Sequence, residues 1–293
     1  PDLSPLAERF ARRSWPGPIT LVLDASHPES LVSQLPPVVR KLVSPGSTIG
    51  LRVPGHQIIL DTLQMIVGPL VLTSANRSGQ PDAKTAGEVV ESLGEGVELI
   101  LDDGPCRFGE ASSVIGINGD EFEILRAGVV PRETLNRLSN RLILFVCTGN
   151  TCRSPMAEAL CRKMMARRLG CPIEELEDRG WLVMSAGMAA MSGARASQQA
   201  IDVMAAAELD ISRHDVQPLT DSLVRYADIV YTMTGSHRQA IVTQWPDAAE
   251  RTSVLCVDSS DVSDPIGGPL ERYQRCAAQI ETELEKRLAD LDL

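Results

Sequence analysis

Residues 146–155 read Val-Cys-Thr-Gly-Asn-Thr-Cys-Arg-Ser-Pro, and this stretch decides the fold of the second half of the chain. It follows a short, wholly apolar segment, residues 142–146, which is typical of a buried central strand of a parallel sheet. It leads into residues 155–169, where a proline at the first turn favours a helix. The sequence therefore predicts a strand, a tight loop and a helix whose N-terminus faces the loop, where an anion is bound best.

The loop residues have the chemistry of a phosphate site with a nucleophile. Seven residues, 147–153, are enough to wrap a phosphate so that backbone N–H groups point inward. Gly149 permits the tight turn, and Arg153 offers a planar fork of donors to two phosphate oxygens. A cysteine at a helix N-terminus beside a guanidinium favours its thiolate form, so Cys147 is the expected nucleophile. The Gly-Lys-Ser/Thr pattern of a nucleotide-binding loop is missing from this string.

These residues resemble the phosphate loop of the low-molecular-weight protein phosphatases. The resemblance extends from Arg141 to the end of the chain, and three more strings follow in the family's order. They are Ser185-Ala186-Gly187, Met233-Thr234 and Ser263-Asp264-Pro265-Ile266-Gly267-Gly268. The family's Asp-Pro pair carries the general acid, which the resemblance assigns to Asp264.

The resemblance implies a two-step reaction without a cofactor. Cys147 attacks phosphorus while Asp264 protonates the leaving group, and Asp264 then activates water to hydrolyse the phosphocysteine. Arg153 and the loop amides stabilise the equatorial oxygens. The remaining phosphate-binding residues of the loop are Thr148, Gly149, Asn150, Thr151, Cys152 and Ser154, of which Asn150 holds the loop shape and Ser154 hydrogen-bonds the thiolate. Two interpretations of Cys152 stay open: a reversible disulfide with the nucleophile, or a small core residue.

The substrate expected from this resemblance is a phosphorylated protein, with phosphoarginine first and phosphotyrosine second. Thr148 and Thr151 stand where tyrosine-directed members usually carry apolar residues, and resemble the loop of the bacterial protein-arginine phosphatases. Ile266 follows the acid where tyrosine-directed members place aromatic side chains that stack on a phenyl ring. Arsenate reduction is a third reading, but it needs two nearby cysteines after the third strand, and residues 231–245 contain none.

Four histidines and scattered cysteines predict no metal site. His214 and His237 are the two histidines of the second half, and we expect them at solvent-facing or capping positions rather than in catalysis.

The first half resembles the YrdC-type threonylcarbamoyl-AMP synthases. The strings that carry the resemblance are Trp15-Pro-Gly-Pro-Ile-Thr20, Gly50-Leu-Arg-Val-Pro54, Thr73-Ser-Ala-Asn-Arg-Ser-Gly79, Asp103-Gly-Pro-Cys106, Ala111-Ser-Ser-Val114 and Ile124-Leu-Arg-Ala-Gly128. The resemblance implies a site that joins ATP, bicarbonate and threonine for a modified adenosine in tRNA, with tRNA-modification proteins as partners. It assigns Ser74 and Asn76 to the nucleotide phosphates, and Arg52, Ser112, Ser113 and Arg126 to the ATP and threonine pocket.

That family begins roughly 60–80 residues earlier, and a sheet without its first strands would expose open edges. The chain opens at Pro1 without an initiator Met, so we expect a fragment of a longer protein. Two readings of this half stay open: a shell that no longer catalyses, or part of a protein that is mainly a threonylcarbamoyl-AMP synthase.

The expected fold is α/β in two domains. Residues 1–137 form a partial YrdC-like domain with a mixed, twisted sheet, and residues 141–293 form a flavodoxin-like phosphatase domain with four parallel strands. The predicted strands are residues 19–23, 48–53, 69–73, 99–101 and 113–117 in the first half, and 142–146, 181–185, 229–233 and 253–256 in the second. Helices are expected at 86–93, 155–169, 196–207 and 270–288, and residues 126–140 are expected to end one domain and form a linker.

Composition excludes several classes of protein. The net charge is −11, divided as −5 before residue 138 and −6 after it, which argues against broad nucleic-acid binding. The apolar runs are far shorter than the roughly 20 residues of a membrane-spanning helix. Seven cysteines, an odd number scattered through a large chain, fit free thiols in a cytoplasmic protein rather than a disulfide framework.

Overall fold

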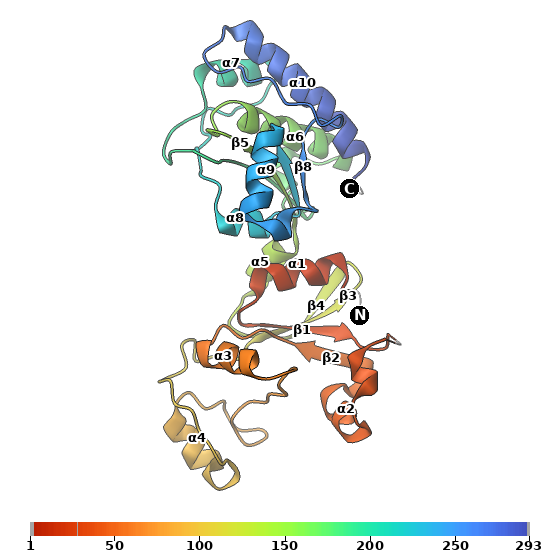
Figure 1. The fold of residues 1–293 in the computed structure, drawn as a ribbon, viewed down its shortest axis with the longest axis vertical. Coiled ribbons are helices and arrows are strands. Elements are labelled where there is room, and N and C mark those ends of the chain that lie inside the picture. Colours follow the sequence, from red (N-terminus) through yellow and green to blue (C-terminus); the bar gives the residue numbers. More distant parts are fainter. Residues whose placement is uncertain (1–2, 28, 292–293) are drawn as a thin grey trace. The chain divides into compact units, whose positions relative to one another are not determined.

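The structure of the chain is a computed structural model that describes residues 3–27 and 29–291. It divides into two compact units, Pro1–Ser139 and Asn140–Leu293, each with its own sheet (Figure 1).

The first unit is built on a mixed four-stranded sheet. Its elements are α1 (Pro5–Ser14), β1 (Ile19–Asp24), α2 (Pro37–Val43), β2 (Thr48–Leu51), α3 (Gln57–Met65), α4 (Ala86–Leu93), β3 (Ser113–Asn118), β4 (Glu121–Arg126) and α5 (Arg132–Ser139), with short 3-10 turns at Leu31–Gln34, Pro45–Ser47 and Gly94–Gly96. The strand order is β2-β1-β3-β4. The β1–β3 pair is parallel and the two outer pairs are antiparallel, which confirms the predicted mixed sheet.

Helices α1 and α5 close the core of this unit over β1 and β3. Phe10 of α1 is fully buried and meets Phe122 of β4 edge to face, with ring centroids 5.2 Å apart. Leu135 and Leu138, three residues apart on one face of α5, are buried in the same cluster. Residues 126–140 were expected to end one domain and form a linker. The first unit does end here, at Ser139, but the linker is wrong, because the segment finishes β4 and forms α5. The polar side chains that suggested a linker are the solvent face of an amphipathic helix.

Two predicted strands of the first unit are irregular in the structure. Residues 69–73 and 99–101 have the apolar composition of strands, but both are irregular backbone with exposed side chains, including Val71 and Leu99. A strand needs a neighbour to pair its N–H and C=O groups. The sheet of this unit pairs β1 to β4 and takes up neither segment.

The second unit is a parallel sheet with helices on both faces. Its elements are β5 (Arg141–Cys147), α6 (Arg153–Leu169), β6 (Trp181–Gly187), α7 (Gln198–Ala206), α8 (Asp221–Tyr226), β7 (Ile229–Thr232), α9 (Gly235–Gln244), β8 (Thr252–Val254) and α10 (Leu270–Ala289), with 3-10 turns at Ile173–Glu175 and Pro246–Ala248. The order β6-β5-β7-β8 and the parallel pairing of all neighbours give the predicted flavodoxin-like arrangement. Helices α8 and α9 were not predicted.

Strand β5 divides the core of this unit into two layers. Ile143, Phe145 and Cys147 point to the layer of α6, α7 and α10. The alternate residues, of which Leu144 is one, pack in the second cluster, on the other face of the sheet. Helices α8 and α9 cover that face (Figure 1). Strand β6 lies on one side of β5 and β7 lies on the other, so the strand order reverses at β5. The carboxyl end of β5 therefore lies at the crevice where such sheets bind ligands. Among the described helices, none is long and apolar enough to cross a membrane.

Candidate active site

The loop between β5 and α6 places Cys147 at the N-terminal end of a 17-residue helix. Cys147 is 3% exposed. Its Sγ accepts a hydrogen bond from the backbone N–H of Asn150 at 3.1 Å and lies 2.9 Å from Oγ of Ser154. Two donors and the positive end of a helix dipole surround one sulfur, and this arrangement stabilises a thiolate.

Asn150 is the residue around which the loop is organised. It is fully buried and has a left-handed backbone, with φ of 54°, which asparagine adopts more readily than most residues. Its Nδ2 donates to Oγ of Ser154 at 2.9 Å and to Oγ of Ser185, at the end of β6, at 2.8 Å. Its Oδ1 accepts from the backbone N–H of Gln217 at 3.0 Å, which fixes the orientation of the amide.

The directions of these hydrogen bonds follow from the carboxylate of Glu158, which can only accept. Ser185 Oγ donates its one proton to Glu158 of α6 at 2.7 Å, so toward Asn150 it is an acceptor. Ser154 Oγ also accepts from Asn150, and its proton is then directed to Cys147. Three side chains, those of Ser185, Asn150 and Ser154, therefore connect Glu158 to Cys147.

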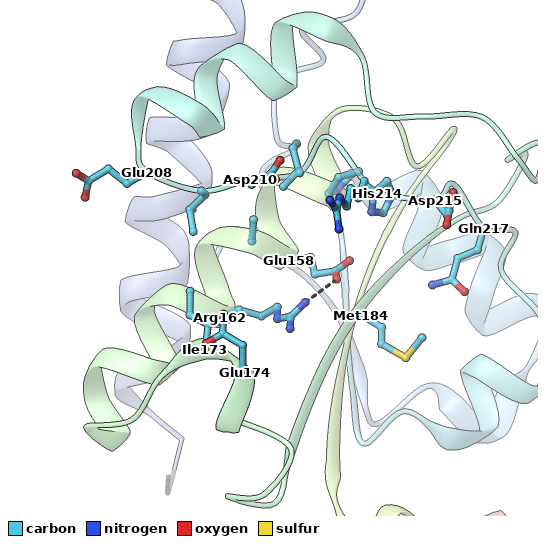
Figure 2. Close-up of a pocket in the computed structure, with 15 residues that line it drawn as sticks. Glu158, Arg162, Ile173, Glu174, Met184, Glu208, Asp210, His214, Asp215 and Gln217 are labelled. Carbon is cyan, nitrogen blue, oxygen red and sulfur yellow. Dashed lines mark ion pairs between the residues drawn. The ribbon is translucent and has the colours of Figure 1, made fainter.

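Glu158 also faces a hollow of about 580 Å³ on the side of α6, shown in Figure 2, where Arg162 lies 3.8 Å from its carboxylate. Burial raises the pKa of Glu158, and the hydrogen bond from Ser185 and the charge of Arg162 oppose this rise. His214 lines the same hollow, and its Nε2 lies 3.1 Å from Oδ1 and 3.2 Å from the backbone oxygen of Asn150. Both partners are acceptors, so Nε2 carries the proton. Burial lowers the pKa of His214.

Gly187 at the end of β6 lets the loop lie against the sheet. A Cβ at this position would stand 2.8 Å from the backbone N of Asn150 and from the backbone O of Thr148. The residues after it hold the loop, since Met188 and Ala189 donate backbone hydrogen bonds to the carbonyl groups of Cys147 and Thr148. The Ser-Ala-Gly string is therefore a support for the phosphate loop.

Arg153 and Asp264 meet although 111 residues separate them in the sequence. Arg153 is 5% exposed, and its Nη2 lies 2.5 Å from Oδ2 of Asp264, whose side chain is 44% exposed. Asp264 is fixed by the N–H of Ile266, which donates to its Oδ1 at 3.1 Å. Its loop is attached to the end of β7 through the N–H of Val262, which donates to the carbonyl of Met233.

The comparisons with known proteins agree with this geometry. The family model described as low molecular weight phosphotyrosine protein phosphatase matches residues 142–292, which is more than half of the chain. The chain belongs to this family.

Curated relatives of the phosphatase domain act on two different phosphorylated residues. A protein-arginine-phosphatase of Bacillus subtilis is 36% identical over 151 residues, which are 50% of this chain and 93% of the relative. A probable low molecular weight protein-tyrosine-phosphatase of Ralstonia nicotianae is 37% identical over 144 residues, 48% of this chain and 89% of the relative. The chain thus includes a phosphatase domain of an enzyme family, while these identities do not separate arginine from tyrosine.

The first unit matches a second family. A model described as telomere recombination, for Sua5, YciO and YrdC proteins, matches residues 2–128. The threonylcarbamoyl-AMP synthase of Pyrococcus abyssi is 35% identical over 133 residues, which are 45% of this chain and 36% of the relative. The chain spans about a third to a little over half of the synthases that it matches. It therefore joins a phosphatase domain to a YrdC-like domain.

The remaining residues of the phosphate loop take different positions. Thr148 is exposed beside the nucleophile, and its Oγ1 lies 2.9 Å from Nε2 of His237 in α9. Thr151 and Gly149 are partly exposed. Cys152 is a buried free thiol whose Sγ is 3.3 Å from Oγ of Ser197 and 3.6 Å from the hydroxyl of Tyr273. The two histidines expected at solvent-facing or capping positions, His214 and His237, both contact the loop.

The aromatic side chains of the phosphatase domain lie in the core or at the edge of the sheet opposite the loop, and Tyr273 contacts Cys152 of the loop from the core. Four of them are at most 5% exposed, namely Phe145, Trp181, Tyr231 and Tyr273. Tyr226 and Trp245 come directly before the turns that lead into β7 and β8, so they lie at the amino edge of the sheet, opposite the loop. Among residues 140–291, which the structure describes, no aromatic ring is therefore placed to stack on a phenyl group at the mouth of the site.

Two cysteines of the phosphatase domain outside the loop, Cys256 and Cys276, are packing residues. Cys256 and Cys276 are each 1% exposed, and burial raises the pKa of Cys276 to about 12 and raises that of Cys256 as well. A thiol that stays protonated is a poor nucleophile for disulfide relay. Within residues 3–27 and 29–291, no group of three or more His, Cys, Asp or Glu could hold a metal ion.

In the YrdC-like domain the structure brings three of six predicted site residues together. Nη2 of Arg126 donates to the backbone oxygen of Ser112 at 2.8 Å and to its Oγ at 3.0 Å. Burial lowers the pKa of Arg52, and the charge of Arg126 lowers it further, so each guanidinium is within electrostatic reach of the other.

The other three predicted residues are used differently. Ser113 is fully buried and exchanges hydrogen bonds with the backbone of Val130. Ser74 is exposed in an irregular segment, and Asn76 donates to backbone oxygens of its own loop, those of Arg77 and Gln80.

Proposed function

We propose that the phosphatase domain hydrolyses phosphoarginine on proteins through a phosphocysteine intermediate. The observation that carries this proposal is the contact between Arg153 and Asp264 beside the loop that begins at Cys147. A nucleophile, an anion-binding guanidinium and a carboxyl group that can carry a proton are the three parts that this reaction needs.

In the first step the thiolate of Cys147 attacks phosphorus in line, and the bond from phosphorus to the leaving nitrogen breaks. Asp264 gives its proton to that nitrogen, so the arginine leaves as the neutral or cationic side chain. The backbone N–H groups of the loop and the guanidinium of Arg153 hold the equatorial oxygens. Arg153 turns from Asp264 to the phosphoryl group, which frees the carboxyl group for the leaving atom.

In the second step Asp264, now a carboxylate, takes a proton from water. The water oxygen attacks phosphorus, the sulfur–phosphorus bond breaks, and inorganic phosphate leaves. Cys147 returns to the thiolate, which Ser154 and the N–H of Asn150 stabilise. No metal or other cofactor takes part in either step.

The mouth of the site supports arginine as the substrate residue. Thr148 and Thr151 give it hydroxyl groups, and the aromatic residues of the domain lie in the core or at the opposite edge. A guanidinium gains from hydroxyl and carboxylate partners, whereas a phenyl ring gains from stacking. The arginine-directed relative of Bacillus subtilis is consistent with this preference.

Phosphotyrosine is the second candidate, because a tyrosine-directed relative is as similar as the arginine-directed one. Arsenate reduction is disfavoured, since Cys256 and Cys276 are buried thiols with raised pKa values.

The mechanism is tested by trapping the intermediate. The full chain is mixed with a phosphoarginine peptide, quenched with acid within milliseconds, and digested for mass spectrometry. We expect one phosphate on the peptide that contains Cys147, and none in the Cys147→Ala variant. Full turnover by Cys147→Ala would contradict a cysteine-dependent mechanism.

For the YrdC-like domain we propose a threonylcarbamoyl-AMP synthase site centred on Arg52, Ser112 and Arg126. Two neighbouring guanidinium groups provide a place for the phosphates of ATP. Threonine- and bicarbonate-dependent release of pyrophosphate from ATP tests this activity, and its partners would be proteins of tRNA modification. Seven free cysteines are consistent with a reducing compartment, so we place the protein in the cytoplasm.

A further inference from the structure

His237 is a buried histidine that touches the phosphate loop and has no part in the two steps proposed above. It lies in the first turn of α9 and is 8% exposed. Its Nε2 is 2.9 Å from Oγ1 of Thr148, and its Nδ1 is 2.8 Å from Oγ1 of Thr234, the N-cap of the helix. Both ring nitrogens have a hydroxyl partner, so the ring is held in one orientation.

Thr148 is the residue through which this ring reaches the site. It follows Cys147 directly and is exposed, so its side chain lies on the open side of the loop. A threonine hydroxyl has one proton and two lone pairs, and what it offers to a substrate depends on the partner to which it donates. A fixed imidazole beside it therefore decides both the rotamer of Thr148 and the polarity of its free side.

The contacts of the ring are compatible with a proton on Nδ1. Oγ1 of Thr234 accepts the backbone N–H of His237 at 3.2 Å and has a further lone pair for Nδ1–H, while its own proton can go to Ser236, whose Oγ is 2.8 Å away. Nε2 is then an acceptor for the hydroxyl of Thr148. Burial lowers the pKa of His237, and the positive charge of Arg153 lowers it further, whereas the charges of Asp261 and Asp264 oppose this fall. The lowered pKa favours the neutral ring that this arrangement requires.

We propose that His237 positions Thr148 as a hydrogen-bond acceptor for the N–H groups of a guanidinium leaving group, and so favours phosphorus–nitrogen over phosphorus–oxygen substrates. A phosphorylated guanidinium group presents N–H donors, whereas the bridging oxygen of a phosphotyrosine ester is an acceptor that gains nothing from a lone pair. His237 touches no reacting atom, so it is a positioning residue that acts through Thr148. The inference rests on the proposed phosphatase activity and deepens it.

A double-mutant cycle on the full chain tests the inference. The variants are His237→Phe, Thr148→Val and the pair of both, with His237→Gln as the conservative replacement, because the end of a glutamine side chain reaches about as far as Nε2. The readout is the ratio of kcat/KM on a phosphoarginine peptide to kcat/KM on the same peptide with phosphotyrosine. Loss of one neutral hydrogen bond should lower this ratio roughly threefold to tenfold in each single variant.

The pair should show the same ratio as Thr148→Val alone, since the ring acts only through that hydroxyl, and His237→Gln should restore most of the ratio. Thermal unfolding identifies a variant that fails to fold, in which case His237→Gln and Thr148→Val alone decide. Ratios that stay unchanged, or effects that multiply in the pair, would overturn the inference. So would a ¹⁵N spectrum of the ring that places its proton on Nε2.

The same measurements distinguish failure of the proposed function from failure of this inference. A wild-type chain inactive on both peptides would overturn the phosphatase proposal and this inference with it. An active wild type whose ratio does not respond to His237→Phe would overturn this inference alone.

Discussion

Arg153 Nη2 lies 2.5 Å from Asp264 Oδ2, which joins the guanidinium proposed to bind phosphate to the residue proposed as general acid. One partner of this ion pair, Arg153, is buried, while the Asp264 side chain is 44% exposed. In the proposed mechanism, an incoming phosphoryl group competes for the same guanidinium and releases the carboxyl group toward the leaving atom, so that substrate binding prepares the acid for its step.

Asp264→Asn should lower kcat/KM on a phosphoarginine peptide, which reports the first chemical step, by about a hundredfold to ten-thousandfold, the usual contribution of a positioned general acid. The loss should be much smaller on p-nitrophenyl phosphate, whose leaving group departs without a proton. Steady-state kinetics on both substrates checks this. Equal losses on the two substrates would show that Asp264 acts only by holding Arg153.

Arg153→Lys should lower kcat/KM by a hundredfold or more, because a point charge cannot replace the planar fork that binds two phosphoryl oxygens. Arg238 is the matched control. It lies on α9 and donates a hydrogen bond to the backbone oxygen of Thr252, at the start of β8. Arg238→Lys should stay within about threefold of the wild type. The assignment of Arg153 fails if the two variants behave alike.

Glu158→Gln should lower kcat roughly threefold to thirtyfold, although Glu158 contacts no substrate. The amide of a glutamine can donate a hydrogen bond to Ser185 Oγ, so that the Ser185 proton no longer points to residue 158. The hydrogen bonds from Asn150 to Ser185 and Ser154, which direct the Ser154 proton to Cys147, are then lost. Glu174→Gln, on the rim of the same hollow, is the control and should have wild-type kinetics. The measurement is kcat for both variants at saturating substrate, and a wild-type kcat for Glu158→Gln would break the proposed chain.

Gly187→Ala should weaken inhibition by inorganic phosphate about tenfold or more and destabilise the domain by about 1–3 kcal/mol. The added Cβ would stand 2.8 Å from two backbone atoms of the phosphate loop, so the loop must move. Gly235→Ala is the control, because its nearest neighbour would be an Asp261 oxygen at 3.9 Å. Competitive inhibition constants and thermal unfolding of both variants check this, and equal constants would mean that the loop tolerates the shift.

The sequence predicted the catalytic loop and the architecture of the phosphatase domain because both depend on local patterns. An apolar run, a Gly-containing loop and a proline at a helix start are readable in residues 142–155. The support of the loop was not readable, since Asn150 is contacted by Ser185 of β6 and by His214 and Gln217 between α7 and α8, and these contacts arise only when the sheet forms. Glu158 joins the same network through Ser185. One local signal was available: His237 lies three residues after Thr234, the spacing of a side-chain cap in the first turn of a helix.

In the YrdC-like domain, apolar composition at residues 69–73 and 99–101 predicted strands, but the segments have no pairing partner in the described sheet. Helix α5 was missed because its core-facing side consists mainly of Leu135 and Leu138 within a polar sequence. Composition alone thus failed where pairing or a narrow apolar face decided the structure.

The most direct test of the central claim is kcat/KM of the full chain on one peptide carrying phosphoarginine or phosphotyrosine, with Cys147→Ser as the control. The proposed function predicts a higher value on phosphoarginine and an inactive Ser variant. A higher value on phosphotyrosine would contradict the substrate proposal, and turnover by Cys147→Ser at the wild-type rate would contradict the mechanism.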